Sequence, residues 1–254
     1  MNLLEMQHVK KDFGENEVLK DISLSVAEGE VVSIIGPSGS GKSTLLRCAT
    51  LLEQMDDGSL TYMGEKAAES INGKTVYAKP ADLKKIQRHF GLVFQNFNLF
   101  PHYSVMKNIT DAPIRIQKRN KDEVFKEARE LLAKMGLSDK ENAYPCQLSG
   151  GQCQRVAIAR ALAQTPKLLI CDEATSAVDV SVQAPIMELL IRIRKEKNLS
   201  ILFISHDLAL VSSFCDRIYV LNHGKVVESG ETAQIIHAPQ QPYTKKLIAS
   251  LLTV

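Results

Sequence analysis

The sequence predicts an α/β fold with a central, mainly parallel sheet, an antiparallel β subdomain and an inserted helical subdomain. Three observations support this prediction. An apolar stretch at residues 31–35 leads into a glycine-rich turn and a helical segment, strand-like and helical stretches alternate between residues 167 and 204, and helical periodicity dominates residues 121–135. With 44% hydrophobic and 24% charged residues, the 254-residue chain has the composition of a folded protein.

The first third of the chain is predicted to be mostly sheet. Alternating or continuous apolar runs at residues 3–8, 22–26 and 31–35 indicate strands. A helix is expected at residues 41–52. The dipeptide Asp57-Gly58, beside a short alternating stretch, predicts a tight turn between further strands.

Beyond Gln95 the pattern becomes helical. Residues 121–135 have helical spacing, with apolar side chains at Val124, Ala128, Leu131, Leu132 and Met135. Strands are expected at 167–171 and 200–204, with a helix at 182–197 between them, which predicts parallel pairing.

The end of the chain is predicted to hold two short strands joined near residues 222–224 and then a helical tail containing Pro239 and Pro242. We expect a single domain. Its nucleotide-binding core comprises residues 1–95 and 163–240, its helical subdomain residues 96–162, and its tail residues 241–254.

Composition excludes several classes of protein. A net charge of +2, from 31 basic and 29 acidic residues, is too balanced to indicate a whole face that attracts nucleic acid, although it leaves local basic patches open. Five scattered cysteines without a C-x-x-C pair indicate reduced, buried thiols, not a disulfide framework or a zinc site. No apolar run approaches the roughly 20 residues that cross a bilayer, and residues 1–13 carry charges where a signal peptide would need an apolar stretch, so we expect a cytosolic protein that reaches a membrane only by docking.

Residues 36–43 match the phosphate-loop pattern G-x-x-x-x-G-K-[ST] between a strand and a helix. Glycines let backbone N–H groups surround phosphates, and the lysine contacts the β and γ phosphates while the hydroxyl holds Mg²⁺. The alternative is a glycine turn without function, which the strand and helix on either side disfavour. The predicted nucleotide-binding residues are Gly36, Pro37, Ser38, Gly39, Ser40, Gly41, Lys42, Ser43 and Thr44.

Two adjacent carboxylates end an apolar strand at residues 168–173. A phosphate loop needs an acidic partner for its metal, so Asp172 is predicted to bind Mg²⁺ and Glu173 to act as general base on the attacking water. A carboxylate pair at a strand end can also be only a helix cap. The phosphate loop favours the catalytic interpretation.

Residues 148–152, Leu-Ser-Gly-Gly-Gln, make the resemblance specific. With the phosphate loop, the Asp-Glu strand and His206, the chain resembles the ATP-binding cassette (ABC) family along nearly its whole length, which implies the core of a P-loop NTPase. The resemblance implies an ATPase that uses ATP and Mg²⁺. It also implies a homodimer in which two cassettes face head to tail and each ATP lies between the phosphate loop of one subunit and the signature sequence of the other.

The resemblance assigns Ser149, Gly150, Gly151 and Gln152 to the γ-phosphate of the partner's ATP. A hydroxyl, backbone N–H groups and a helix N-terminus suit an anion. Ser149 is also a good helix N-cap, and both interpretations can hold together.

Four further positions match family motifs. Phe13 is expected to stack on adenine, although an aromatic residue at a strand end is more often part of the core. Gln95 resembles the glutamine that reaches Mg²⁺ and senses the γ-phosphate, and residues 96–101 resemble the segment that faces the membrane subunits. Asp179 resembles the residue that communicates between the two ATP sites, and His206 the switch histidine. A lone glutamine is usually a surface residue, and a lone histidine there more often caps a helix.

The sequence departs from the family pattern at two positions: Ala174 stands where proline is common, and Cys153 where glutamine is common. Neither position is expected to touch nucleotide, so the expectation of activity stands. A protein that binds ATP without turnover conflicts with the presence of Glu173 and His206.

The subfamily signals are divided. Residues 45–48, 97–102 and 108–113 resemble the cassettes of polar amino acid importers, whereas residues 239–245 resemble the tail of oligopeptide and nickel importer cassettes. We weight the middle of the chain more heavily, because residues 96–113 are expected to recognise the membrane partner.

The implied partners are two transmembrane permease subunits and, indirectly, an extracytoplasmic solute-binding protein. The implied place is the cytoplasmic face of a bacterial cell membrane. A soluble ABC ATPase without transport is the alternative from another class, but such proteins usually carry two cassettes or a long coiled coil.

Overall fold

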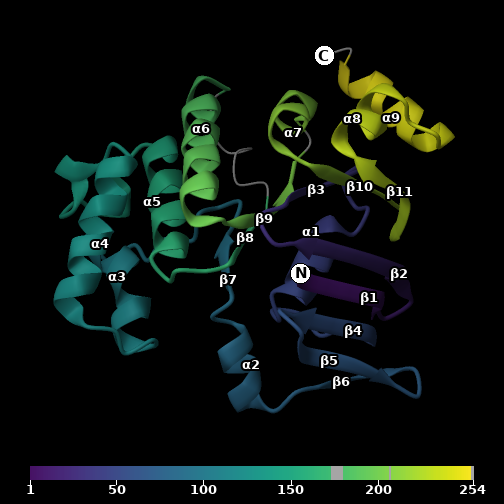
Figure 1. Ribbon diagram of the computed structural model, residues 1–254, viewed down its shortest axis with the longest axis horizontal. Coiled ribbons are helices and arrows are strands. Elements are labelled where there is room, and N and C mark those ends of the chain that lie inside the picture. Colours follow the sequence, from purple (N-terminus) through teal and green to yellow (C-terminus); the bar gives the residue numbers. More distant parts are fainter. Residues whose placement is uncertain (173–179, 206, 253–254) are drawn as a thin grey trace.

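The computed structural model describes residues 1–172, 180–205 and 207–252 (Figure 1). Glu173, Asp179 and His206, three of the residues predicted to act at the site, lie outside these ranges.

The central sheet is mainly parallel, as the sequence predicted. Within the described residues its strand order is β11-β10-β3-β9-β8-β7, with parallel pairs throughout except for the antiparallel pair β10 and β11. The strands are β3 (Val31–Ile35), β7 (Phe90–Val93), β8 (Leu168–Asp172), β9 (Ser200–Ile204), β10 (Arg217–Asn222) and β11 (Lys225–Glu231).

The second sheet is antiparallel, which confirms the predicted β subdomain. Its strands, in the order β2-β1-β4-β5-β6, are β1 (Asn2–Phe13), β2 (Asn16–Ala27), β4 (Asp57–Tyr62), β5 (Glu65–Ile71) and β6 (Lys74–Tyr77).

The predicted tight turn at Asp57-Gly58 is wrong, because both residues begin β4. Gly58 has φ +114, and a Cβ there would lie 2.8 Å from the carbonyl oxygen of Gln7. The glycine therefore permits close approach of β4 to β1, and the turn itself falls at Met63 and Gly64, whose φ values are 51 and 83.

Helices cover the central sheet and extend from it. They are α1 (Lys42–Ala49), α2 (Pro80–Ile86), α3 (Val105–Arg115), α4 (Lys121–Lys134), α5 (Gly150–Leu162), α6 (Val180–Lys197), α7 (Leu208–Phe214), α8 (Thr232–His237) and α9 (Pro242–Leu252), with short 3₁₀ turns η1 (Ser138–Lys140) and η2 (Pro145–Gln147). In Figure 1 the teal helices α3, α4 and α5 gather on one side of the molecule, away from the antiparallel sheet. Helices α3, α4 and α5 contact one another, whereas the exact boundaries of the subdomains stay a prediction.

Buried side chains form two clusters, one on each face of the central sheet. Along β8 and β9 the residues alternate between them: Leu169 and Phe203 pack toward the helices, and Ile170 and Leu202 toward α1 and the antiparallel sheet. This two-sided burial explains why β3, β8 and β9 are nearly continuous apolar runs.

The five cysteines are free, and three of them are buried as predicted. Burial raises the pKa of the thiols of Cys48, Cys171 and Cys215 to about 12, so they stay protonated and unreactive. For Cys146 the prediction is wrong: it lies exposed in η2, where the backbone runs along the surface.

Glu228 of β11 holds the start of the tail. Its two carboxylate oxygens accept hydrogen bonds from the backbone N–H groups of Gln240 and Gln241, at 2.8 and 3.1 Å. Pro242 follows as the first residue of α9, and Ile248 of this helix is buried in the core. Part of the Pro-Gln-Gln-Pro motif thus serves to attach the tail helix.

We predict that Glu228→Ala destabilises the protein by about 1 kcal/mol at pH 7, a typical value for a lost helix-terminal carboxylate. Burial acts to raise the pKa of Glu228, but the neighbouring Thr244 side chain and the hydrogen bonds from the two backbone N–H groups outweigh it and lower that pKa. A lowered pKa means that the stabilisation is present above the usual glutamate pKa and lost as the pH falls through the folded-state value. Urea unfolding at pH 7 and pH 4 measures the free energy of unfolding of the wild type and of Glu228→Ala. If the two free energies differ by the same amount at both pH values, the prediction is contradicted.

Candidate functional site

The carboxyl ends of four parallel strands meet at one edge of the central sheet. Asp172, the last residue of β8, pairs in register with Ile204 near the end of β9, and Ile204 pairs with Ile34 of β3. On the other side of β8, Val93 of β7 pairs with Cys171. The phosphate loop after β3, Asp172 and Gln95 are therefore brought to the same edge, where ligands of open α/β sheets bind.

The phosphate loop is held in an open, glycine-dependent conformation. Gly36, Gly39 and Gly41 have φ values of 153, 77 and 100. A Cβ on Gly36 would lie 2.2 Å from the carbonyl oxygen of Leu221, so no larger residue fits there. In the described part of the chain the N–H groups of Ser38, Gly39 and Gly41 have no acceptor. Unpaired N–H groups in such a loop, at the N-terminus of α1, suit a phosphate.

Lys42 is nearly buried and lies against this loop. Its ammonium donates hydrogen bonds to the carbonyl oxygens of Gly36 and Pro37, both at 2.9 Å. These contacts keep the positive charge at the loop, where a phosphate needs it.

Ser43 and Asp172 are brought together from positions far apart in the sequence. The hydroxyl of Ser43 lies 3.4 Å from a carboxylate oxygen of Asp172. Hydroxyl and carboxylate oxygens are ligands that Mg²⁺ accepts, so this pair fits the metal that the sequence predicted. Gln95 is exposed and follows the carboxyl end of β7 by two residues, so its backbone lies at the same edge.

Phe13 ends β1 and is not a core residue, since 49% of it is exposed. The ammonium of Lys11 lies 4.9 Å from the centre of its ring. Lys11 itself is held by Glu53 and Asp56, each at 3.3 Å. Sequence reasoning missed Lys11, although a lysine two residues before an exposed aromatic in an alternating strand shares its face.

The signature residues begin helix α5. Ser149 is its N-cap: the hydroxyl accepts from the N–H of Gln152 at 3.3 Å, and the Gln152 side chain accepts from the N–H of Ser149 at 2.9 Å. This capping box occupies the Gln152 carboxamide oxygen within its own helix. Ser149 and Gly150 are exposed, and among the described residues none of the signature residues bonds to the phosphate loop.

These features match one family of proteins. The model of the ABC transporter family matches residues 19–176, more than half of the chain. The chain belongs to the ABC transporter family. It is accordingly an ATPase that binds ATP.

Among curated relatives, this cassette is 40% identical to the L-cystine import ATP-binding protein TcyC of Bacillus subtilis, over 98% of this chain and 99% of that protein. It is 42% identical to the methionine import ATP-binding protein MetN 4 of Oceanobacillus iheyensis, over 99% of this chain and 71% of that protein. It is 38% identical to the arginine transport ATP-binding protein ArtM of Bacillus subtilis, over 98% of this chain and all of that protein.

A solved structure of the ATP-binding cassette MJ0796, dimeric and bound to ADP and Pi after hydrolysis, is similar to this cassette with a TM-score of 0.78 and 34% identity. The match covers 90% of this chain and 98% of that one. The likeness confirms the predicted fold class.

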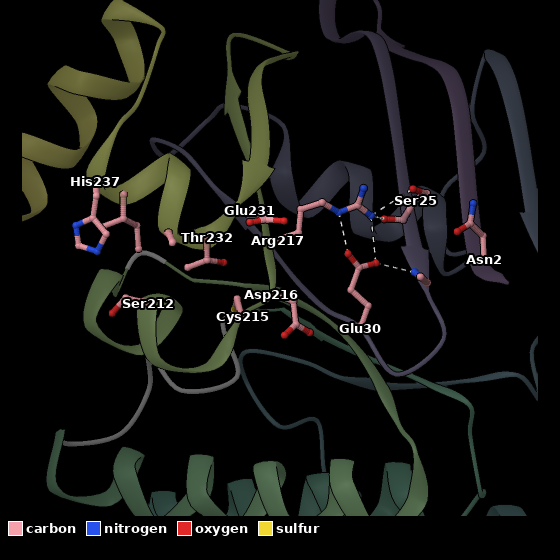
Figure 2. Close-up of a pocket in the computed structure, with 13 residues that line it drawn as sticks. Asn2, Ser25, Glu30, Ser212, Cys215, Asp216, Arg217, Glu231, Thr232 and His237 are labelled. Atoms are coloured by element: carbon pink, nitrogen blue, oxygen red, sulfur yellow. Dashed lines mark hydrogen bonds and ion pairs between the residues drawn. The ribbon is translucent and has the colours of Figure 1, made fainter.

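A polar pocket of about 750 Å³ lies at the opposite edge of the sheet, near the amino ends of β3 and β10 (Figure 2). The Arg217 guanidinium bridges this pocket, with its Nε 2.9 Å from Glu30 and another nitrogen 2.7 Å from the carbonyl oxygen of Ser25. Asp216 is paired with Arg194 at 2.6 Å. None of the predicted site residues lines the pocket, and its main charges bind one another, so we assign it no role in catalysis.

We predict that Lys42→Ala raises the dissociation constant for ATP at least about tenfold, because charge-assisted hydrogen bonds are worth about 1.5–3 kcal/mol. Lys84→Ala, which removes an exposed lysine of α2, serves as the control. Isothermal titration calorimetry measures both. Equal affinities of the two variants would remove Lys42 from the phosphate site.

Proposed function

We propose that two copies of this chain power a membrane importer of polar amino acids by binding and hydrolysing ATP, with Mg²⁺, where the two copies meet. The observation that supports this proposal is a separation within one protomer. The phosphate loop and Asp172 share one edge of the sheet, whereas among the described residues the exposed N-terminus of α5 makes no hydrogen bond with them.

Hydrolysis is assigned to residues at the carboxyl edge. Lys42 and the loop N–H groups would hold the β and γ phosphates, and Ser43, Asp172 and Gln95 would hold Mg²⁺. The metal would supply neutralisation of the phosphate charge. Glu173 would orient and deprotonate the attacking water, and His206 would hydrogen-bond the γ-phosphate; both assignments rest on the sequence alone.

The partner cassette would complete the site. Helix α5 presents Ser149 and Gly150 to solvent at its positive N-terminal end. Such an end suits the γ-phosphate of an ATP held by the other copy, and Asp179 would report on that second site. The dimeric state of the solved cassette MJ0796 supports two copies.

The docking segment, residues 96–101, would contact the membrane subunits. Phe100 in this segment is 55% exposed, and its ring stacks at a tilt on Tyr103, 5.1 Å away. Aromatic side chains are enriched at protein interfaces relative to the rest of the surface. Within residues 1–172, 180–205 and 207–252, no helix is both long and apolar enough to span a bilayer. We therefore infer peripheral attachment at the cytoplasmic face, through two permease subunits that receive solute from an extracytoplasmic binding protein.

An amino acid is the solute class that we propose. The relatives described above are named for cystine, methionine and arginine. The competing signal, the tail motif of oligopeptide and nickel importers, is weakened because Gln240, Gln241 and Pro242 serve to attach α9.

Purification from detergent-solubilised membranes tests the proposal. We expect two hydrophobic subunits to co-purify with the protein, and a polar amino acid with its binding protein to stimulate ATP hydrolysis in vesicles. Phe100→Ser should lose the membrane subunits and keep ATP binding. Ile116→Ser, which alters an exposed apolar residue at the end of α3, should keep both. Recovery of ribosomes or DNA in place of membrane subunits would favour a soluble ABC ATPase.

ATP-dependent dimerisation tests the trans role of the signature. In a Glu173→Gln background, which should bind ATP without turnover, light scattering is expected to show a dimer on ATP addition. Adding Ser149→Arg should abolish it, whereas Ser138→Arg, an exposed change in η1, should not. Loss of the helix cap costs about 1 kcal/mol, so thermal unfolding of the monomer is followed in parallel. A dimer that survives Ser149→Arg would refute the shared site.

A further inference from the structure

Arg160, near the end of helix α5, is bonded to the backbone that follows Gln95. One guanidinium nitrogen donates to the carbonyl oxygen of Asn98 at 2.6 Å, and another donates to that of Phe97 at 2.8 Å. The two fixed N–H directions of a guanidinium match two neighbouring carbonyl groups, which a single ammonium point charge would match less well. Residues more than 60 positions apart are thereby joined.

The segment that Arg160 holds has an unusual conformation. Phe97 and Asn98 have φ values of 58 and 46, in the left-handed region that costs energy for side-chain-bearing residues. The turn is closed by the N–H of Phe97 on the carbonyl oxygen of Phe94 at 3.1 Å. Gln95 lies inside this turn, so whatever fixes the turn also fixes the direction of Gln95.

The environment of Arg160 makes these bonds hard to replace. The residue is half-buried, and burial lowers its pKa, although a guanidinium remains charged at neutral pH. Across the described residues no carboxylate lies within ion-pair distance of it, and the Phe100 ring centre is 6.0 Å away. The two loop carbonyls and the Phe100 ring are therefore the groups that offset its desolvation.

We propose that Arg160 is a positioning residue that ties Gln95 and the docking segment to the signature helix, so that the three move as one unit. Ser149, the N-cap of α5, and Arg160, near the end of the same helix, are about 16 Å apart along the helix axis at 1.5 Å per residue. A displacement of the N-terminus of α5 is therefore transmitted along the helix to the segment that carries Gln95 and Phe100. This inference rests on the proposed roles of Gln95 and of residues 96–101.

A double-mutant cycle in the assembled transporter tests this link. Arg160→Lys keeps the charge but loses the two-pronged geometry. We expect solute-stimulated kcat to fall about tenfold, with KM for ATP within about twofold, since the residues that hold the triphosphate are untouched. In a Gln95→Ala background, Arg160→Lys should lower kcat by a smaller factor than it does in the wild type, because both changes remove the same positioned glutamine.

Arg155→Lys is the matched control. Arg155 lies on the same helix and donates to the backbone carbonyl oxygens of Met135 and Gly151, at 2.8 and 3.3 Å, away from the turn. The variant Arg155→Lys should lower the thermal stability of the protein as much as Arg160→Lys does, while leaving kcat unchanged. If Arg160→Lys and Gln95→Ala reduce kcat additively, or if Arg155→Lys reduces kcat equally, Arg160 is only structural and the inference is overturned. If Gln95→Ala alone leaves kcat unchanged, the proposed role of Gln95 fails as well.

Discussion

Parallel pairing of β7, β8, β9 and β3 is the constraint on which this structure depends. Because these strands run in one direction and in close register, their carboxyl ends share an edge, and the residues that follow each strand become neighbours. Ser43 and Asp172, 129 residues apart, approach to 3.4 Å for this reason. Two-sided burial holds the same strands between two close-packed apolar clusters, so a displacement of any strand would disturb the packing on both faces.

Much of the remaining structure positions groups relative to this edge. The Gly36 backbone packs against Leu221, which anchors the phosphate loop to β10. The ammonium of Lys11 lies against the ring of Phe13 at the end of β1, and Arg160 donates hydrogen bonds to the strained turn beyond β7. Each of these arrangements costs conformational freedom or desolvation of a charge, and each fixes the position of a segment that the proposed function uses. The polar pocket at the amino edge shows a different pattern, because Glu30 and Asp216 are already paired with arginines.

The prediction failed where local composition and tertiary contact gave different answers. Asp57-Gly58 has the composition of a turn, yet Gly58 is required by the approach of β4 to β1. Cys146 was expected to be buried on the basis of its residue type, but the short 3₁₀ turn that contains it lies on the surface.

By itself the sequence determined the family, the phosphate loop, the Asp172 strand and the parallel core, because these depend on short-range patterns: apolar period, glycine positions and motif spacing. Only the tertiary structure decided that Phe13 is exposed and that Arg160 is hydrogen-bonded to the backbone beyond Gln95. Those facts depend on contacts between segments distant in the chain. Such contacts follow from the packing of whole helices and strands, which no local pattern of residues specifies.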